Sequence, residues 1–233
     1  MTARRARPLA AACRDVARTA QEIYRLGLVR GTAGNVSARD PATGHIAITP
    51  SAVPYDAIRP QDIVVVDRRG TILAGRYPPS TELPMHIVLY DHRPWARGIV
   101  HTHSVYATTF ACLGQEIPPA HYLIAFVGPR IPIAPYAPHG TPEIGRRAVE
   151  AMGESRAVLL QNHGVVAVGR SVAEAQILAD IVEYTAEVCY KARAIGVPVL
   201  IPDDELERLR ARFATYGRGP SAEKGIIKPD ERP

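Results

Sequence analysis

Apolar residues recur every three or four positions along several stretches of the chain, the spacing typical of helices with one buried face. In the first stretch Ala12, Val16 and Ile23 follow this spacing. A later stretch opens on Ser171-x-x-Glu174, the pattern of a capping box. We therefore predict helices over residues 12–26, from about 80 through 89, over 141–153, over 171–196, and from about 203 to 217.

Short apolar runs, each bounded by proline, glycine or polar residues, alternate with these stretches and predict strands. They cover residues 46–49, 63–66, 98–104, 131–136, 157–160 and 165–168. The residues Asn162-His163-Gly164 separate the last two runs and indicate a tight turn between antiparallel strands. Regular strand, long helix, strand units are missing from the pattern. We predict an α/β protein with three layers, in which helices cover both faces of a central, largely antiparallel sheet.

Length and composition are those of an ordinary globular chain. The 233 residues include 46% hydrophobic and 22% charged residues. We predict one domain over residues 1–217 and a flexible C-terminal tail over 218–233. No apolar run approaches the roughly 20 residues that a membrane span requires, so a membrane protein is not expected.

The formal net charge is +5, but the basic residues are spread along the chain. A nucleic-acid-binding protein usually gathers them into one patch, so nucleic acid is not an expected partner. A mildly positive protein suits an anionic metabolite. Cys13, Cys112 and Cys189 are an odd number with no CxxC pair, which argues against a disulfide framework and predicts a cytoplasmic protein.

Three histidines are candidate metal ligands. His101 and His103 lie two apart in a predicted strand, so their imidazoles would point to the same face. His163 occupies the predicted hairpin turn. Each has an ordinary alternative: polar alternation on a solvated strand produces an HxH pair, and turns favour polar residues. Three histidines with one open position are nevertheless the arrangement of many catalytic zinc sites.

Glu82 is the candidate acid or base, because it stands near the start of a predicted helix beside Ser80 and Thr81. An acidic residue there is also favoured by the helix dipole alone. The hydroxyls of Ser80 and Thr81, together with a second donor-rich loop around Gly34 and Asn35, could hold a phosphate without a lysine.

The motifs that carry these residues are spread over nearly the whole chain. They are GTAGNVSAR at 31–39, ITPSAVPY at 48–55, PSTE at 79–82, VHTHS at 100–104, HYLIA at 121–125, APYAPHGT at 134–141, LLQNHG at 159–164 and FATYG at 213–217. With these motifs the chain resembles class II aldolases of the L-fuculose-phosphate aldolase type, within the wider aldolase and adducin-head superfamily.

The resemblance implies one Zn²⁺ per subunit, held by His101, His103 and His163. It implies that Glu82 is the catalytic acid and base, and a fourth ligand when the site is empty. It also implies a homotetramer with active sites between subunits, in which Tyr122 crosses a subunit contact to serve the hydroxyl at the cleaved bond. The remaining expected site residues are Tyr216, which closes the site, and the substrate-binding residues Gly34, Asn35, Ser51, Ala52, Ser80, Thr81, His139 and Phe213.

Two positions depart from the family pattern. Ala52 stands in the phosphate loop where the family more often has glycine, and His139 stands where the fuculose-phosphate enzymes carry an aromatic apolar residue. The resemblance implies cleavage of a ketose 1-phosphate to dihydroxyacetone phosphate and an aldehyde. L-Fuculose 1-phosphate is the first expected substrate, and 5-deoxypentulose 1-phosphates fit the same machinery.

Related enzymes catalyse other reactions at the same metal site. They include ribulose-phosphate 4-epimerases, methylthioribulose-phosphate dehydratases and keto-acid decarboxylases. Glu82 argues against the epimerase, which typically carries aspartate at this position. Adducin-like heads are non-catalytic interaction modules that lack the metal histidines, whereas all three histidines are present here.

Overall fold

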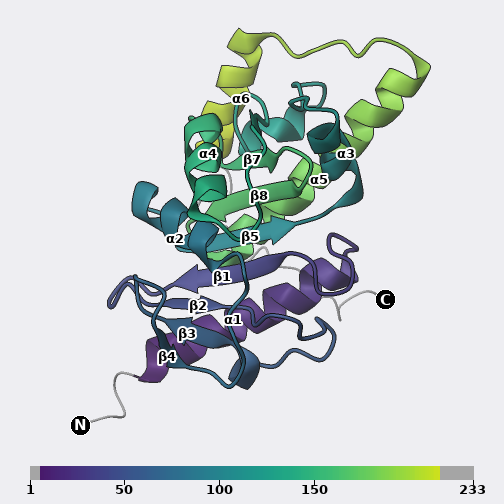
Figure 1. Ribbon diagram of the computed structural model, residues 1–233. Coiled ribbons are helices and arrows are strands. Elements are labelled where there is room, and N and C mark those ends of the chain that lie inside the picture. The colour runs from purple at the N-terminus through teal and green to yellow at the C-terminus, as the bar shows by residue number, and fades with distance from the viewer. Residues whose placement is uncertain (1–5, 216–233) are drawn as a thin grey trace, which may run out of the picture.

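In the computed structural model, which describes residues 6–215, eight strands form one sheet in the order β4-β3-β2-β1-β5-β8-β7-β6 (Figure 1). All pairings among the described strands are antiparallel except that of β6 with β7. The prediction of a largely antiparallel sheet is therefore confirmed. The strands are β1 (Asn35–Arg39), β2 (Ile46–Ile48), β3 (Val64–Val66), β4 (Ile72–Ala74), β5 (Gly98–Thr102), β6 (Ile133–Ala134), β7 (Ala157–Leu160) and β8 (Gly164–Gly169).

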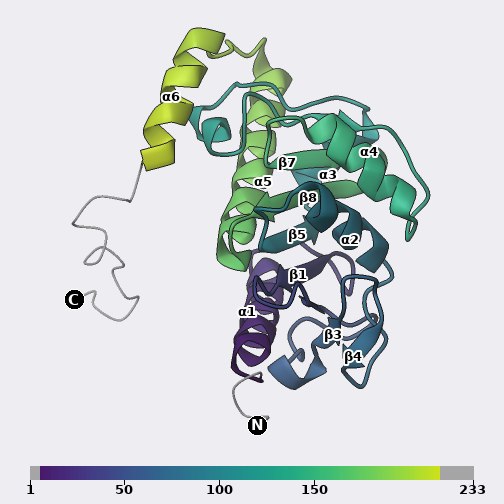
Figure 2. The same ribbon diagram turned by 90° about the vertical axis from the view of Figure 1, so that its left-hand side faces the viewer.

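Helices cover both faces of this sheet. The helices are α1 (Ala6–Arg25), α2 (Leu83–His92), α3 (Val105–Cys112), α4 (Pro142–Met152), α5 (Val172–Ile195) and α6 (Asp203–Thr215), with short 3₁₀ helices η1 (Pro60–Asp62) and η2 (Tyr122–Phe126). Figure 2 shows α1 and α5 on one face and α2 and α4 on the other. The α3 side chains pack in the same core cluster as those of α1 and α5. The predicted three-layer architecture is confirmed.

Side-chain alternation along the central strands separates two cores. In β5, Val100 packs toward α1, α3 and α5, whereas Ile99 packs toward α2 and α4. Val165 and Val166 of β8 divide in the same way. Each such buried side chain contributes about 1.5–3 kcal/mol. Because both faces are buried, β7 and β8 are continuous apolar runs.

The predicted helix near Ser80 begins later than expected. The first helical residue of α2 is Leu83, and Glu82 is the residue that caps it. Ser80 belongs to the turn before the helix, where its hydroxyl accepts the Glu82 N–H at 3.3 Å. At α5 only half of the capping box forms: Ser171 accepts the Glu174 N–H, while the Glu174 carboxylate binds Arg156.

The sequence predicts a donor-rich loop around Gly34 and Asn35, and this prediction is wrong from Asn35 onward, where strand β1 begins. Asn35–Arg39 pairs with β2 on one side and with β5 on the other. Its polar residues Asn35 and Ser37 are buried, at 2% and 0% exposure. Their side chains form hydrogen bonds with Glu82, His86 and Tyr90, while Val36 and Ala38 alternate with them and pack in the core on the other face of the sheet. The polar positions of this strand are therefore buried, where a sequence pattern would place them in solvent.

The described helices include none that is long and apolar enough to cross a membrane. Residues 1–5 and 216–233 lie outside the described part of the chain. The domain boundary at 217 and the predicted tail therefore stay predictions.

Candidate metal and substrate site

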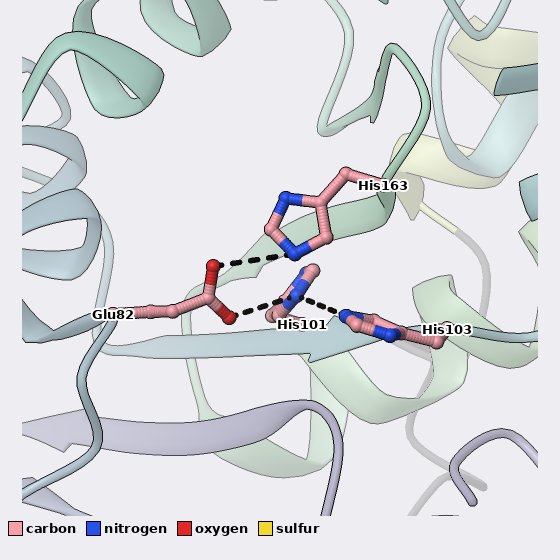
Figure 3. A group of neighbouring side chains, drawn as sticks. All are labelled: Glu82, His101, His103 and His163. Atoms are coloured by element: carbon pink, nitrogen blue, oxygen red, sulfur yellow. Dashed lines mark hydrogen bonds and ion pairs between the residues drawn. The ribbon is translucent and has the colours of Figure 1, made fainter. Parts of the chain in front are cut away.

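Four side chains from three parts of the chain converge at one end of the central strands (Figure 3). Glu82 comes from the start of α2, His101 from β5, His103 from just beyond β5, and His163 from the turn between β7 and β8. One potential ligand atom of each lies within 4.8 Å of the others. The structure thus brings together all four residues that the sequence predicted as metal ligands.

Two glycines allow neighbouring backbone segments to pack closely beside the histidines and so help to position them. Gly34 has a φ of +84°, and an added Cβ would lie 2.7 Å from the carbonyl oxygen of His101. An added Cβ at Gly164 would lie 2.3 Å from the carbonyl oxygen of Thr102. Both glycines let neighbouring strands pack closely against this end of β5. Asn162 adopts a φ of +57°, which asparagine tolerates, and so turns the chain at His163.

Hydrogen bonding fixes which atom of His101 faces the cluster. Its Nδ1 lies 2.9 Å from the carbonyl oxygen of Val165. A carbonyl oxygen only accepts, so Nδ1 carries the proton and donates, as metal-binding histidines commonly do. The Nε2 atom of His101 lies 2.9 Å from Glu82 Oε2 and 3.0 Å from Nε2 of His103 (Figure 3).

The donor set fits a cation. Glu82 is 3% exposed, and its Oε1 accepts no hydrogen bond from the described residues, although His163 Nε2 lies 3.4 Å away. A buried carboxylate oxygen without a partner is costly. A divalent cation among these nitrogen and oxygen atoms would satisfy all of them together. Three imidazoles and a carboxylate suit zinc and its neighbours in the first transition row.

The charge states agree with metal binding. Burial and the neighbouring imidazoles lower the pKa of His103 to about 3 and that of His163 to about 4. Both rings are therefore neutral near pH 7, the form that binds metal. Burial acts to raise the pKa of Glu82, but His101, His163 and the Asn35 amide outweigh it and hold that pKa below its ordinary value. Glu82 is ionised.

A cavity of about 280 Å³ opens onto the cluster. Its walls come from the start of β1, from the loop after β2, from the start of α2 and from the loop before α4. The lining residues are Thr32, Ala33, Gly34, Asn35, Pro50, Ser51, Ala52, Ser80, Thr81, Glu82, His103, His139 and His163. Most of the predicted substrate-binding residues thus share one cavity with the metal cluster.

The two positions that depart from the family pattern both lie in this cavity. Ala52 has a φ of +59°, the left-handed region that glycine favours. The backbone here therefore keeps a glycine-like conformation without glycine. The His139 ring stacks on that of His163, with centroids 5.8 Å apart, and its Nε2 lies 3.3 Å from the Thr81 hydroxyl. His139 thus adds a polar group beside a predicted ligand.

Tyr122 and Phe213 do not line this cavity. Tyr122 begins η2, is 49% exposed, and its ring lies 6.2 Å from that of Phe213 in α6. Figure 2 shows α6 beyond α5, on the opposite face of the sheet from α2. Tyr216 lies outside the described residues. Within one chain, the structure brings neither Tyr122 nor Phe213 to the cluster.

His86 is a polar residue near the site that the sequence reasoning missed. It is fully buried on α2, and its Nε2 lies 2.5 Å from Oδ1 of Asn35. Asn35 in turn donates to Glu82 at 2.8 Å. The available signal was spacing: His86 follows Glu82 by four positions, so both lie on one face of a helix.

Comparisons with known proteins agree with this geometry. The profile of the class II aldolase and adducin N-terminal domain family matches residues 14–190. Over 192 residues, 82% of this chain and 90% of the relative, the chain is 42% identical to 5-deoxy-D-ribulose 1-phosphate aldolase from Bacillus thuringiensis serovar kurstaki. It is 41% identical to 5-methylthioribulose-1-phosphate/5-deoxyribulose-1-phosphate aldolase from Rhodospirillum rubrum, over 85% of this chain and 89% of the relative. A solved structure of L-fuculose 1-phosphate aldolase superposes with a TM-score of 0.85 at 36% identity, covering 88% of this chain and 96% of that one.

Proposed function

The chain belongs to the class II aldolase and adducin N-terminal domain family and is a metal-dependent aldehyde-lyase, and we propose that it cleaves a deoxyketose 1-phosphate with the help of zinc. The products are dihydroxyacetone phosphate and a short aldehyde. The observation that carries the proposal is the cluster of His101, His103, His163 and Glu82, which opens onto a cavity lined by hydroxyl and amide donors.

In this proposal His101, His103 and His163 hold one Zn²⁺, and Glu82 is a fourth ligand while no substrate is bound. The ion, when bound, acts as a Lewis acid that stabilises negative charge developing on the oxygen atoms of the dihydroxyacetone-phosphate half. Ser51, Ser80, Thr81 and the backbone around Gly34 bind the phosphate group. The cavity contains no described lysine or arginine, so hydroxyl and backbone donors perform this task.

Glu82 is the acid and base at carbon. Its pKa lies below the ordinary value, so near pH 7 it is a carboxylate. In the direction of condensation it would accept a proton from the carbon next to the ketone, and in cleavage it would first take up a proton from water and deliver it to that carbon. The oxygen available for this task is Oε1, which accepts no hydrogen bond from the described residues. Its partner Oε2 is engaged by the Asn35 amide.

Among possible substrates, we favour 5-deoxyribulose 1-phosphate, which would release acetaldehyde. Two relatives at 42% and 41% identity have this compound in their names. L-Fuculose 1-phosphate, which would release lactaldehyde, is the second candidate and is supported by the structural relative. His139 is the residue proposed to distinguish the aldehydes, because it brings an imidazole to the cavity where fuculose-phosphate enzymes carry an apolar ring.

The active assembly is proposed to be a homotetramer in which Tyr122 of one subunit takes the hydroxyl proton on the leaving carbon in the site of another. Phe213 and Tyr216 would accompany Tyr122 and cover the aldehyde. The support is that Tyr122 is half exposed and lies away from its own cluster. Cys13, Cys112 and Cys189 are free in the described chain, which suits a reducing compartment such as the cytoplasm.

The test of the reaction is a substrate panel. Purified protein is stripped with a chelator, reloaded with Zn²⁺, and supplied separately with 5-deoxyribulose 1-phosphate, L-fuculose 1-phosphate, 5-methylthioribulose 1-phosphate and ribulose 5-phosphate. Release of dihydroxyacetone phosphate is followed by a coupled dehydrogenase. We expect zinc-dependent release from the deoxyketose 1-phosphates. No release from any of them would refute the proposal, and epimerisation of ribulose 5-phosphate would favour the alternative reaction.

The test of the shared site uses two inactive variants. Glu82→Gln lacks the acid and base, and Tyr122→Phe lacks the hydroxyl. Mixed oligomers regain activity if Tyr122 serves a neighbouring subunit, because some sites then combine an intact Glu82 with an intact Tyr122. A mixture that stays inactive, although subunit exchange is demonstrated by mass, would refute the shared site.

A further inference from the structure

Buried polar side chains join the facing sides of α2 and β1. On α2 they occur at every fourth position, and on β1 at every second position, so each set lies on one face of its element. We call these residues the polar ladder: Glu82, His86 and Tyr90 on α2, and Asn35 and Ser37 on β1. No member is more than 3% exposed.

The ladder is a continuous chain of short hydrogen bonds. Nδ2 of Asn35 lies 2.8 Å from Glu82 Oε2, and Oδ1 of Asn35 lies 2.5 Å from Nε2 of His86. Nδ1 of His86 lies 2.6 Å from the Ser37 hydroxyl. The Ser37 hydroxyl lies 2.9 Å from the hydroxyl of Tyr90. The helix and the strand thus alternate as partners from the metal cluster into the core.

The chemistry of the members gives this chain one direction. An ionised carboxylate only accepts, so Asn35 presents its NH₂ group to Glu82 and its carbonyl oxygen to His86. His86 must then donate from Nε2. Burial lowers the pKa of His86 to about 3, so the ring is neutral and its Nδ1 accepts from Ser37.

The Tyr90 hydroxyl is the last donor in this chain of hydrogen bonds. Burial raises the pKa of Tyr90 above its ordinary value, so the phenol keeps its proton and donates to Ser37. Every donor in the ladder therefore points toward Glu82. An amide does not pass a proton from one side to the other in this geometry, so Asn35 interrupts proton transfer. The ladder orients groups and is not a proton wire.

We propose that His86 is a positioning residue that acts through Asn35 to hold the Glu82 carboxylate by Oε2, leaving Oε1 directed to the metal and the substrate. Glu82 is the N-cap residue of α2, where its carbonyl oxygen accepts the Met85 and His86 N–H groups but its side chain makes no capping hydrogen bond. Its side chain has one described hydrogen-bond donor besides the histidines of the cluster, namely Asn35. Without His86, the Asn35 amide would lose the partner that fixes its orientation.

This inference rests on the proposed function for the role of Glu82, but it can be measured without turnover. The variants are His86→Leu, which removes both hydrogen bonds at similar volume, and His86→Gln, which can still donate toward Asn35. The matched control is His92→Leu, since His92 lies on the same helix, is exposed, and its side chain bonds only to the carbonyl oxygen of Val88 among the described residues. Zn²⁺ affinity of each metal-free protein is measured by competition with a chromophoric chelator.

We expect His86→Leu to weaken Zn²⁺ binding by about 10–100-fold, the usual effect of removing a group that orients a ligand. His86→Gln should recover most of this loss, and His92→Leu should match the wild type. Deuterium exchange into dihydroxyacetone phosphate in D₂O supplies the second readout. There the expected change for His86→Leu is a fall in kcat by about 10–100-fold with little change in KM.

Equal zinc affinity in His86→Leu and His92→Leu would overturn the inference. If His86→Leu does not fold, Ser37→Ala replaces it. Without the Ser37 donor, His86 can adopt the other tautomer, in which its Nε2 is an acceptor that no longer donates to Asn35. Unchanged zinc affinity in Ser37→Ala would overturn the inference as well. A wild type that binds zinc but cleaves no ketose phosphate would refute the proposed reaction alone, because the zinc affinities would still decide the role of His86.

Discussion

Replacing Gly164 with alanine should damage both the fold and the metal site. An added Cβ would lie 2.3 Å from the carbonyl oxygen of Thr102, 3.1 Å from Cδ2 of His103 and 3.4 Å from Cε1 of His101. An ordinary carbon–oxygen contact is about 1 Å longer than the first of these distances, so β8 and β5 must separate by about that amount. The separation occurs beside two predicted metal ligands.

The cost can be estimated from two contributions. Overpacking of this kind costs about 1–3 kcal/mol. Lengthening one or two hydrogen bonds between β5 and β8 adds roughly 0.5–1.5 kcal/mol for each. We expect the free energy of unfolding to fall by about 3 kcal/mol, a large part of the roughly 5–15 kcal/mol typical of a domain. With an m value of about 2–3 kcal/mol/M, the urea midpoint should fall by about 1 M.

Urea unfolding of the metal-free protein, followed by circular dichroism, measures this change. Zinc affinity should fall in parallel, because metal–ligand distances tolerate only about ±0.2 Å. Gly196→Ala is the matched control: its φ of +173° is extended, and an added Cβ would meet no described atom within 4 Å. If Gly164→Ala unfolds at the same urea concentration as this control and binds zinc equally well, the close approach of β8 to β5 is not what positions the histidines.

Three other perturbations have defined outcomes. Glu82→Gln should still bind zinc through the three histidines, with lowered affinity, when metal is supplied in excess, yet lose cleavage by about 10²–10⁴-fold, and full activity would remove its assigned role. For His86, His103 and His163 the folded-state pKa values of about 3, 3 and 4 lie below the unfolded value near 6.5, so the unfolded chain binds more protons below that pH. The free energy of unfolding of the metal-free protein should therefore fall as the pH drops from about 6.5 toward 4, and urea midpoints that do not change over this window would contradict the burial argument. Ala52→Gly should remove the strain of a left-handed alanine, roughly 1–2 kcal/mol, at a cost of about 0.5–1 kcal/mol in the conformational entropy of the unfolded chain. The melting temperature should therefore stay the same or rise, and a fall would argue against strain at this position.

Local spacing was enough to predict part of the site. His101 and His103 are two residues apart, and the apolar residues before them predict a strand. Alternate side chains of a strand point to the same face, so the sequence alone predicts that the two imidazoles share a face. His163 was predictable as a turn residue because short apolar strands flank it. That this turn lies beside β5 depends on the order of strands in the sheet, which no local pattern encodes. Resemblance, not spacing, brought the three histidines together.

The remaining differences have separate physical causes. In the strand Asn35–Arg39, Asn35 and Ser37 are buried by pairing with the polar face of α2, whereas sequence reasoning assigns polar positions of a short strand or helix to solvent. His86 was overlooked for the same reason. Ser80 is a good capping residue by type, but its hydroxyl closes the turn before α2 and leaves Glu82 at the helix start. The roles proposed for Tyr122 and Phe213 would require a neighbouring subunit, and no local sequence pattern predicts contacts between subunits.

The position of β5 between β1 and β8 also affects when the site appears during folding. Glu82 and Asn35, which are hydrogen-bonded, are 47 residues apart, and His101 bonds a carbonyl 64 residues away. Pairings of such long separation form late, because the loops that they close cost chain entropy first. Zinc capture should therefore coincide with the last, slowest phase of refolding. A metal-sensitive dye added during refolding would then report completion of the native sheet.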